Sequence, residues 1–249
     1  MSRRKRKANC NKYRKQQGED YLRVIQGGAP LQRTRNTEVT LIPKNFNQDK
    51  LIGHINNAKV NIVFAIGPAG TGKTIVSTLA GIQQLKKNKI DKFVVTRPAV
   101  SVDEQHGFLP GTLQEKMAPW TRPIFDVFED YYSPDQIEYM LNDNKVEIAP
   151  LAYMRGRTFK NSYIIADEMQ NATDSQMKML LTRIGEGSKL IITGDLAQHD
   201  RGFESNGLKL FMERLKRVSS DRIRYVEFDN ADIARHPVVD EVLRLYGEA

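Results

Sequence analysis

The stretch that most constrains the fold is the eight-residue segment Gly67-Pro68-Ala69-Gly70-Thr71-Gly72-Lys73-Thr74. It matches the pattern GxxxxGK[ST], and it lies between an apolar run at 61–66 and a segment of helical period. In that context the glycines let backbone N–H groups surround a phosphate, and the helix that follows directs its positive dipole end there. The sequence therefore predicts a nucleotide-binding P-loop, with Lys73 at the β- and γ-phosphates of ATP and Thr74 on Mg²⁺.

The rest of the chain alternates apolar runs with segments of helical period, which is typical of a parallel sheet covered by helices. We expect strands at 61–66, 92–96, 146–149, 163–166, 189–193 and 224–227, and helices after Gly72, Thr112, Ser133, Thr173, Glu204 and Pro237. A chain of 249 residues has room for one ordinary domain with an extension. The pattern predicts an α/β fold, namely a single RecA-like P-loop NTPase domain with a mostly parallel sheet.

The charge of the chain is unevenly placed. Residues 1–38 hold 11 Lys/Arg and 3 Asp/Glu, whereas residues 39–249 hold 27 of each sign, so the net charge of +8 belongs to the first segment. We interpret 1–38 as a basic, disordered or loosely attached N-terminal extension, and 39–249 as the P-loop domain. The extension either neutralises phosphates along a nucleic acid or is a solvated terminal segment.

Location is predicted from what the sequence lacks. The basic run at 3–7 leads into polar residues instead of the apolar core of a signal peptide, and the single Cys10 permits no intramolecular disulfide. Apolar runs are far shorter than the roughly 20 residues that span a bilayer. We expect a cytoplasmic protein without a membrane-spanning role.

Two adjacent carboxylates, Asp167 and Glu168, follow the apolar run 163–166. At a strand end, Asp167 can hold the Mg²⁺ shell while Glu168 orients or deprotonates the water that attacks the γ-phosphate. The alternative is a helix-capping Asp167 with a solvated Glu168. Kinases with P-loops have less need for a water-activating Glu, so the pair favours hydrolysis.

A third polar cluster follows the run 189–193 and consists of Thr193, Gly194 and Asp195, then Gln198 and Asp200. Side chains that leave a neighbouring strand there can hydrogen-bond the γ-phosphate or its water. A plain turn that ends a strand is the alternative.

Taken together, these motifs resemble the PhoH-like family, whose ATPase domain is similar to the first motor domain of superfamily 1 helicases. The resemblance covers roughly 39–249 and rests on segments 67–74, 96–100, 109–111, 155–158, 167–171, 193–195 and 232–237. It implies a Mg²⁺-dependent ATPase with a nucleic-acid partner.

The resemblance also implies roles for two residues outside these strand ends. Gln48 matches the glutamine that recognises adenine, because its amide donates and accepts at once. The alternative for Gln48 is an exposed position on a helix surface. Arg235 matches an arginine that stabilises γ-phosphate charge, within the chain or across a subunit boundary. An ordinary ion pair with Asp232 or Asp240 is the alternative for Arg235.

Nucleic-acid contacts are expected, by the same resemblance, at 97–100 and 155–160. Arg97, Arg155, Arg157 and Lys160 would supply cations for backbone phosphates, with Tyr153 and Phe159 stacking on bases. The alternative is a pair of core aromatic residues beside surface charges.

Related motors close two RecA-like domains around ATP, and this chain has one. We therefore expect a homo-oligomer, such as a ring. The favoured function is ATP hydrolysis coupled to binding, translocation along or unwinding of RNA, with single-stranded DNA as a substitute. The alternatives are a P-loop kinase or ATPase that acts on a small molecule or protein, and a nucleotide-gated nucleic-acid-binding module.

Overall fold

The structure is a computed structural model that describes residues 38–98, 113–198, 206–234 and 237–246. The proposed extension at 1–38 lies outside the described residues except for its last residue. Arg235 and Asp200 also lie outside them. The boundary between extension and domain therefore stays a prediction. None of the described helices is both long and apolar enough to cross a membrane.

One parallel sheet organises the described chain, with its strands in the order β3-β2-β4-β5-β1-β6. The strands are β1 (Ile62–Ile66), β2 (Lys92–Thr96), β3 (Val146–Ile148), β4 (Ser162–Ala166), β5 (Lys189–Gly194) and β6 (Ile223–Glu227). Each predicted strand differs from an observed one by at most one residue at either end. The predicted α/β fold is confirmed, and the described sheet is parallel throughout.

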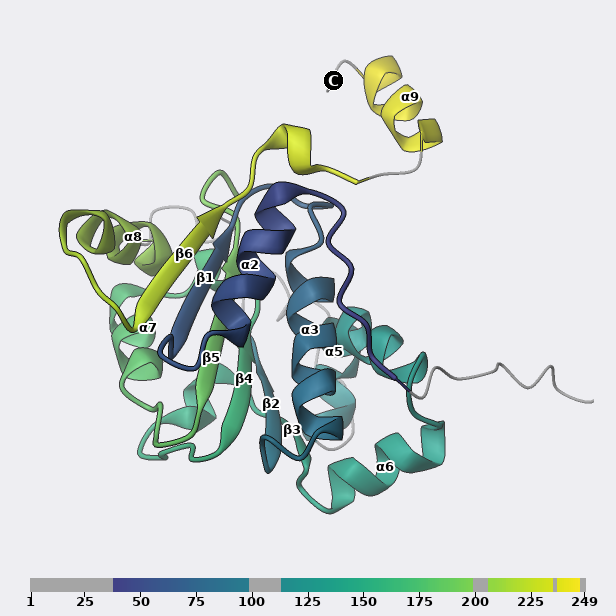
Figure 1. The fold of residues 1–249 in the computed structure, drawn as a ribbon, viewed down its shortest axis with the longest axis vertical. Coiled ribbons are helices and arrows are strands. Elements are labelled where there is room, and N and C mark those ends of the chain that lie inside the picture. Colours follow the sequence, from purple (N-terminus) through teal and green to yellow (C-terminus); the bar gives the residue numbers. More distant parts are fainter. Residues whose placement is uncertain (1–37, 99–112, 199–205, 235–236, 247–249) are drawn as a thin grey trace, which may run out of the picture. The chain divides into compact units, whose positions relative to one another are not determined.

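The central strands are buried along their whole length, because helices cover both faces of the sheet. On one face lie α2 (Phe46–Asn56), α3 (Lys73–Lys86), α5 (Leu113–Glu129) and α6 (Pro134–Asn142) (Figure 1). On the other lie the 3₁₀ turn η1 (Leu151–Met154), α7 (Asp174–Leu181) and α8 (Gly207–Arg217). The turns η2 (Met169–Asn171) and η3 (Asn230–Asp232) and the helix α9 (Pro237–Tyr246) complete the described elements.

Among the α-helices and strands of the described residues, α2 is the one that the apolar pattern did not predict. It buries only Leu51 and Ile55 among its apolar side chains, together with the polar Gln48. Asn45 caps its first turn by accepting a hydrogen bond from the Gln48 backbone N–H at 2.8 Å. With so few buried apolar positions, capping and tertiary contacts define α2 more than amphipathic periodicity does.

The strand order brings the three sequence motifs to one edge of the sheet. The P-loop follows β1, the carboxylate pair follows β4, and the segment 193–195 ends β5. Strand β5 lies between β1 and β4, and Ile66 pairs with Gly194 in the register. Because the strands are parallel, their carboxyl ends meet at the same edge. Segments about 100 residues apart in the sequence thus form one site.

Candidate functional site

Two glycines give the P-loop its path between β1 and α3. Gly67 has a φ of 145°, and a Cβ there would lie 2.4 Å from the Phe228 carbonyl oxygen. Gly72, with a φ of 83°, immediately precedes α3, and a Cβ there would lie 2.7 Å from Gln48 Nε2. The Phe228 backbone thus approaches Gly67 too closely for any other residue, and the left-handed backbone at Gly72 would strain any other residue. At these two positions the loop backbone can approach a phosphate closely.

Lys73, in the first turn of α3, is 9% exposed and turns its ammonium group back into the loop. Its Nζ donates hydrogen bonds to the carbonyl oxygens of Gly67 at 2.7 Å and Pro68 at 2.6 Å. Burial lowers the pKa of Lys73 below its usual range, although nearby carboxylates such as Asp195 oppose this. A bound phosphate would compete with the two carbonyls for this cation.

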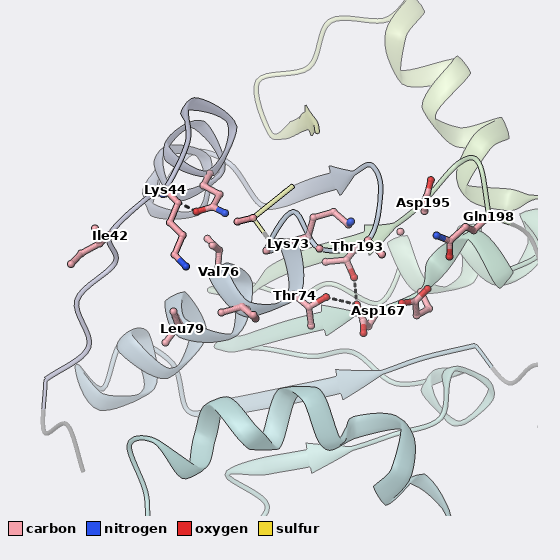
Figure 2. A pocket seen from close by; sticks show the side chains of 18 residues that line it. Ile42, Lys44, Lys73, Thr74, Val76, Leu79, Asp167, Thr193, Asp195 and Gln198 are labelled. Atoms are coloured by element: carbon pink, nitrogen blue, oxygen red, sulfur yellow. Dashed lines mark hydrogen bonds between the residues drawn. The ribbon is translucent and has the colours of Figure 1, made fainter. Parts of the chain in front are cut away.

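Asp167 lies at the end of β4 and joins the other two motifs. Its Oδ1 accepts a hydrogen bond from the Thr74 hydroxyl at 3.0 Å and another from the Thr193 hydroxyl (Figure 2). The carboxylate is 9% exposed. Asp167 therefore holds hydroxyl groups of the P-loop and β5, and it does not have the helix-capping role of the alternative interpretation. One hydroxyl and one carboxylate at a P-loop form the oxygen ligand set that suits Mg²⁺.

Glu168 has a left-handed backbone, with φ 55° and ψ 39°, which costs a residue other than glycine about 1 kcal/mol. Its carboxylate accepts a hydrogen bond from Gln170 Nε2 at 2.5 Å. Gln170 is 1% exposed, and its Oε1 accepts from the Asp195 backbone N–H at 3.1 Å. Gln170 thus links Glu168 to the end of β5. Sequence reasoning gave Gln170 no role, although its place two residues after the carboxylate pair was the available signal.

A cavity of about 400 Å³ opens over these residues. Figure 2 shows polar side chains such as Thr74, Asp167 and Gln198 at one end, and Ile42, Val76 and Leu79 at the other. The structure places these predicted site residues in the lining: Gln48, Ala69, Gly70, Gly72, Lys73, Thr74, Asp167, Glu168, Thr193, Gly194, Asp195 and Gln198. Gly67, Pro68 and Thr71 of the P-loop do not line it. The division into an apolar end and a polar end matches a base and a polyphosphate.

Gln48 is 3% exposed, so the interpretation of an exposed helix-surface side chain is wrong. Its Oε1 accepts from the Lys44 backbone N–H at 2.9 Å, and its Nε2 donates to the Thr71 carbonyl oxygen at 3.0 Å. A primary amide has two hydrogens and two lone pairs, so one donor and one acceptor site remain for a ligand. Adenine recognition by Gln48 stays a prediction.

The residues expected to contact nucleic acid are in different environments. Arg157 forms a bidentate ion pair with Glu147 at 2.5 and 2.9 Å, and its guanidinium lies 4.5 Å from the centre of the Phe159 ring. Hydrogen bonding to Arg157 lowers the pKa of Glu147. Phe159 is 4% exposed, so the prediction that it stacks on bases is wrong, because its ring is part of the core.

The remaining predicted nucleic-acid residues are accessible to different degrees. Tyr153, Arg155 and Lys160 are exposed, and Arg97 is half-buried after β2. Exposed cations beside an exposed ring suit a nucleic-acid strand, whereas the Arg157 guanidinium is already paired.

The P-loop also contacts the segment that precedes Arg235. The Ala234 backbone N–H donates to the Gly70 carbonyl oxygen at 3.1 Å, and Ala234 lines the cavity. Arg235 itself lies outside the described residues, so its role stays a prediction.

Comparisons with solved structures give distant matches, with low sequence identities and low TM-scores. Pif1 helicase from Candida albicans matches with a TM-score of 0.38 and 15% identity, over 82% of this chain and 44% of that one. The DNA-bound helicase MrfA matches with a TM-score of 0.43 and 11% identity, over 86% and 34% of the two chains.

Comparisons of sequence are closer. A PhoH-like protein of Bacillus subtilis is 48% identical over 188 residues, which are 75% of this chain and 58% of the relative. A PhoH-like protein of Synechocystis is 42% identical over 217 residues, or 87% and 65% of the two chains. The chain thus spans less than two thirds of either relative. The family model described as PhoH-like protein matches residues 40–247. This chain belongs to the PhoH-like family.

Proposed function

We propose that this chain binds ATP with Mg²⁺, hydrolyses it, and couples hydrolysis to RNA or single-stranded DNA. The observation that carries the proposal is the hydrogen bond from the P-loop hydroxyl of Thr74 to the buried carboxylate of Asp167, beside a cavity of nucleotide size. The family assignment supports a P-loop protein, and the activity is inferred from these side chains.

Each site residue has a distinct task in this proposal. Lys73 leaves the carbonyls of Gly67 and Pro68 to meet the phosphates, which restores an ionic partner to a buried cation. Thr74 and Asp167 would hold Mg²⁺, which supplies charge neutralisation on the phosphate oxygens when bound. Glu168, held by Gln170, accepts the proton of the attacking water or orients it.

Steady-state ATP hydrolysis with Mg²⁺ tests the proposal. Lys73→Ala and Glu168→Gln should each reduce turnover by about 100-fold or more, because the first removes a cation that acts on the reacting phosphate and the second removes the carboxylate that acts on the attacking water. Glu186→Gln, the same chemical change at an exposed position away from the cavity, serves as the control. Transfer of phosphate to an added acceptor in preference to water would favour a kinase instead.

Nucleic-acid coupling is tested by adding single-stranded RNA or DNA to the same assay. Exposed Tyr153, Arg155 and Lys160 support this part of the proposal. Either polymer should raise turnover, and the effect should weaken as salt increases. A nucleotide-gated binding module does not need hydrolysis. If the RNA affinity of Glu168→Gln still changes with nucleotide, and if this variant replaces the wild-type protein in cells, the chain is such a module instead.

A homo-oligomer, such as a ring, completes the proposal, since one motor domain closes a nucleotide site only with a neighbour. Sedimentation with ATP, Mg²⁺ and RNA should show a species larger than the monomer. A monomer under all these conditions contradicts this part. The cytoplasmic location stays a prediction from the sequence.

A further inference from the structure

Two segments distant in sequence are hydrogen-bonded beside the apolar end of the cavity. They are the first turn of α2 and the turn η3 after β6. Asn47 Nδ2 donates to Asp232 Oδ2 at 2.6 Å, and Asn45 Nδ2 donates to the Asp232 carbonyl oxygen at 3.1 Å. The pair Asn47 and Asp232 is separated by 185 residues in the chain. We call these two residues the latch.

Asp232 is buried, with 7% of the residue exposed, and its carboxylate accepts hydrogen bonds from Asn47 and from its own turn. Its Oδ2 also accepts a hydrogen bond from the Asp229 backbone N–H at 3.0 Å. Among the described residues, no cation lies within ion-pairing distance of this carboxylate. A buried carboxylate without hydrogen-bond donors is costly. Because Asn47 supplies one of the donors to Asp232, η3 is held where this carboxylate can reach Asn47 on α2.

The latch is connected to residues that face the cavity, although neither Asn47 nor Asp232 lines it. Asn45 links Asp232 to the Gln48 backbone through its two hydrogen bonds. Two residues beyond Asp232, the backbone of Ala234 is hydrogen-bonded to the P-loop, and Ala234 lines the cavity with Gln48. A shift of η3 against α2 would therefore change the separation of Gln48 and Ala234.

We propose that Asn47 and Asp232 are positioning residues that fix the base end of the nucleotide cavity. They set nucleotide affinity and base preference by holding Gln48 and Ala234, while the side chains of Lys73 and Glu168, which act on the phosphate and the water, make their hydrogen bonds elsewhere. The inference rests on the proposed function, because it assumes that the cavity binds a nucleotide. It concerns binding, so it is tested without hydrolysis.

The test exchanges donor and acceptor across the latch. Asn47→Asp places two carboxylates in contact. Asn47→Asp combined with Asp232→Asn removes that repulsion, but an amide NH₂ that faces the carboxylate at position 47 offers no acceptor to the Asp229 backbone N–H. Asp232→Asn alone keeps an oxygen that accepts from Asn47 and Asp229. Asn56→Asp adds the same charge at the exposed far end of α2 and is the matched control.

Calorimetric binding of ADP and GDP, together with KM and kcat for ATP, reads out the effect. Asn47→Asp should weaken ADP binding about tenfold or more, the scale of one charge-assisted hydrogen bond, and should narrow the preference for ADP over GDP. Asp232→Asn should stay within about threefold of wild type, and the double exchange should bind ADP more tightly than Asn47→Asp, because the two carboxylates no longer repel each other. In all variants kcat should change less than about twofold while KM follows the affinity, which a general loss of structure would not produce.

Several results would contradict the proposed role of the latch. Wild-type ADP affinity in Asn47→Asp is one, and failure of the folded double exchange to recover affinity is another. Thermal unfolding identifies variants that do not fold, and Asp232→Asn then carries the test, since a tenfold loss in that folded variant also contradicts the proposal. If wild type binds ADP without hydrolysing ATP, the proposed ATPase fails while the latch is still judged by affinity. If wild type binds neither nucleotide, both proposals fail.

Discussion

Thr74 and Asp167, 93 residues apart in the sequence, share a hydrogen bond of 3.0 Å where the P-loop meets the end of β4. The same carboxylate oxygen accepts from Thr193 at the end of β5, so the P-loop and the ends of β4 and β5 are joined at one atom. An oxygen with two hydroxyl donors can exchange one of them for a cation without becoming unpaired. This arrangement holds the hydroxyl group of the P-loop in a fixed place beside the two strand ends.

The first prediction concerns metal dependence. Thr74→Ala and Asp167→Asn should each raise the Mg²⁺ concentration needed for half-maximal ATP hydrolysis by about tenfold or more, because the first removes an oxygen ligand and the second replaces a charged carboxylate ligand with a neutral amide. A Mg²⁺ titration at saturating ATP measures this. Thr182→Ala, at an exposed threonine away from the cavity, is the control. Unchanged Mg²⁺ dependence in both site variants would place the metal elsewhere.

The second prediction concerns Gln170. Gln170→Ala should lower kcat by about tenfold with little change in ATP affinity, because Glu168 loses the donor that orients it. Gln170→Glu replaces the donor with a second carboxylate, which repels Glu168 from its present position, so it should lower kcat at least as much as Gln170→Ala. Steady-state kcat and ATP affinity of both variants measure this.

The Gln170→Ala variant is the control for the added charge, because it removes the hydrogen bond to Glu168 and introduces no carboxylate. Wild-type kcat in both variants would mean that Gln170 does not orient Glu168 for catalysis.

Much of this architecture could be predicted from local patterns. The P-loop and the buried strands have short-range signals, so their positions and the parallel sheet follow from period and motif. Helix α2 has too few apolar residues for that method, and its buried Gln48 depends on contacts with Lys44 and Thr71. The pairing of Asn47 with Asp232 joins segments 185 residues apart, and no local rule specifies such a pair.

Phe159 shows the opposite difficulty. Its neighbours Arg157 and Lys160 predicted a surface segment, yet Phe159 forms an isolated parallel bridge with Ile184 and packs into the core. A single bridge of this kind leaves no repeating pattern in the sequence. Charged neighbours therefore did not reveal the direction of the aromatic side chain.

The third prediction compares two helical glycines. A Cβ at Gly81 would lie 2.3 Å from a ring atom of Phe93 and 2.7 Å from Tyr163, whereas at Gly53 nothing lies within 4 Å. Gly81→Ala should lower the free energy of unfolding by about 1–3 kcal/mol through overpacking. Gly53→Ala should raise it by up to about 1 kcal/mol through helix propensity. Urea unfolding measures both, and equal shifts in one direction would contradict the packing between α3 and the sheet.

The last prediction separates two arginines of the segment that was expected to bind nucleic acid. Arg155 is exposed, whereas Arg157 is paired with Glu147 and packed on Phe159. Arg155→Ala should weaken RNA binding and flatten its salt dependence by about one unit of slope, with unfolding unchanged. Arg157→Ala should lower the free energy of unfolding by about 1–3 kcal/mol, because Glu147 loses its bidentate partner.

Fluorescence anisotropy with a single-stranded RNA across a salt series measures the first effect, and urea unfolding measures the second. Glu147→Gln, alone and in combination with Arg157→Ala, supplies the control, because the two single variants and the double variant form a cycle that measures the coupling of this pair. Glu147 also pairs with Lys92 at 2.9 Å, so the double variant should be no more stable than Arg157→Ala alone. If Arg157→Ala flattens the salt dependence as much as Arg155→Ala does, the ion pair opens when RNA binds, and Arg157 contacts phosphate as the family resemblance implied.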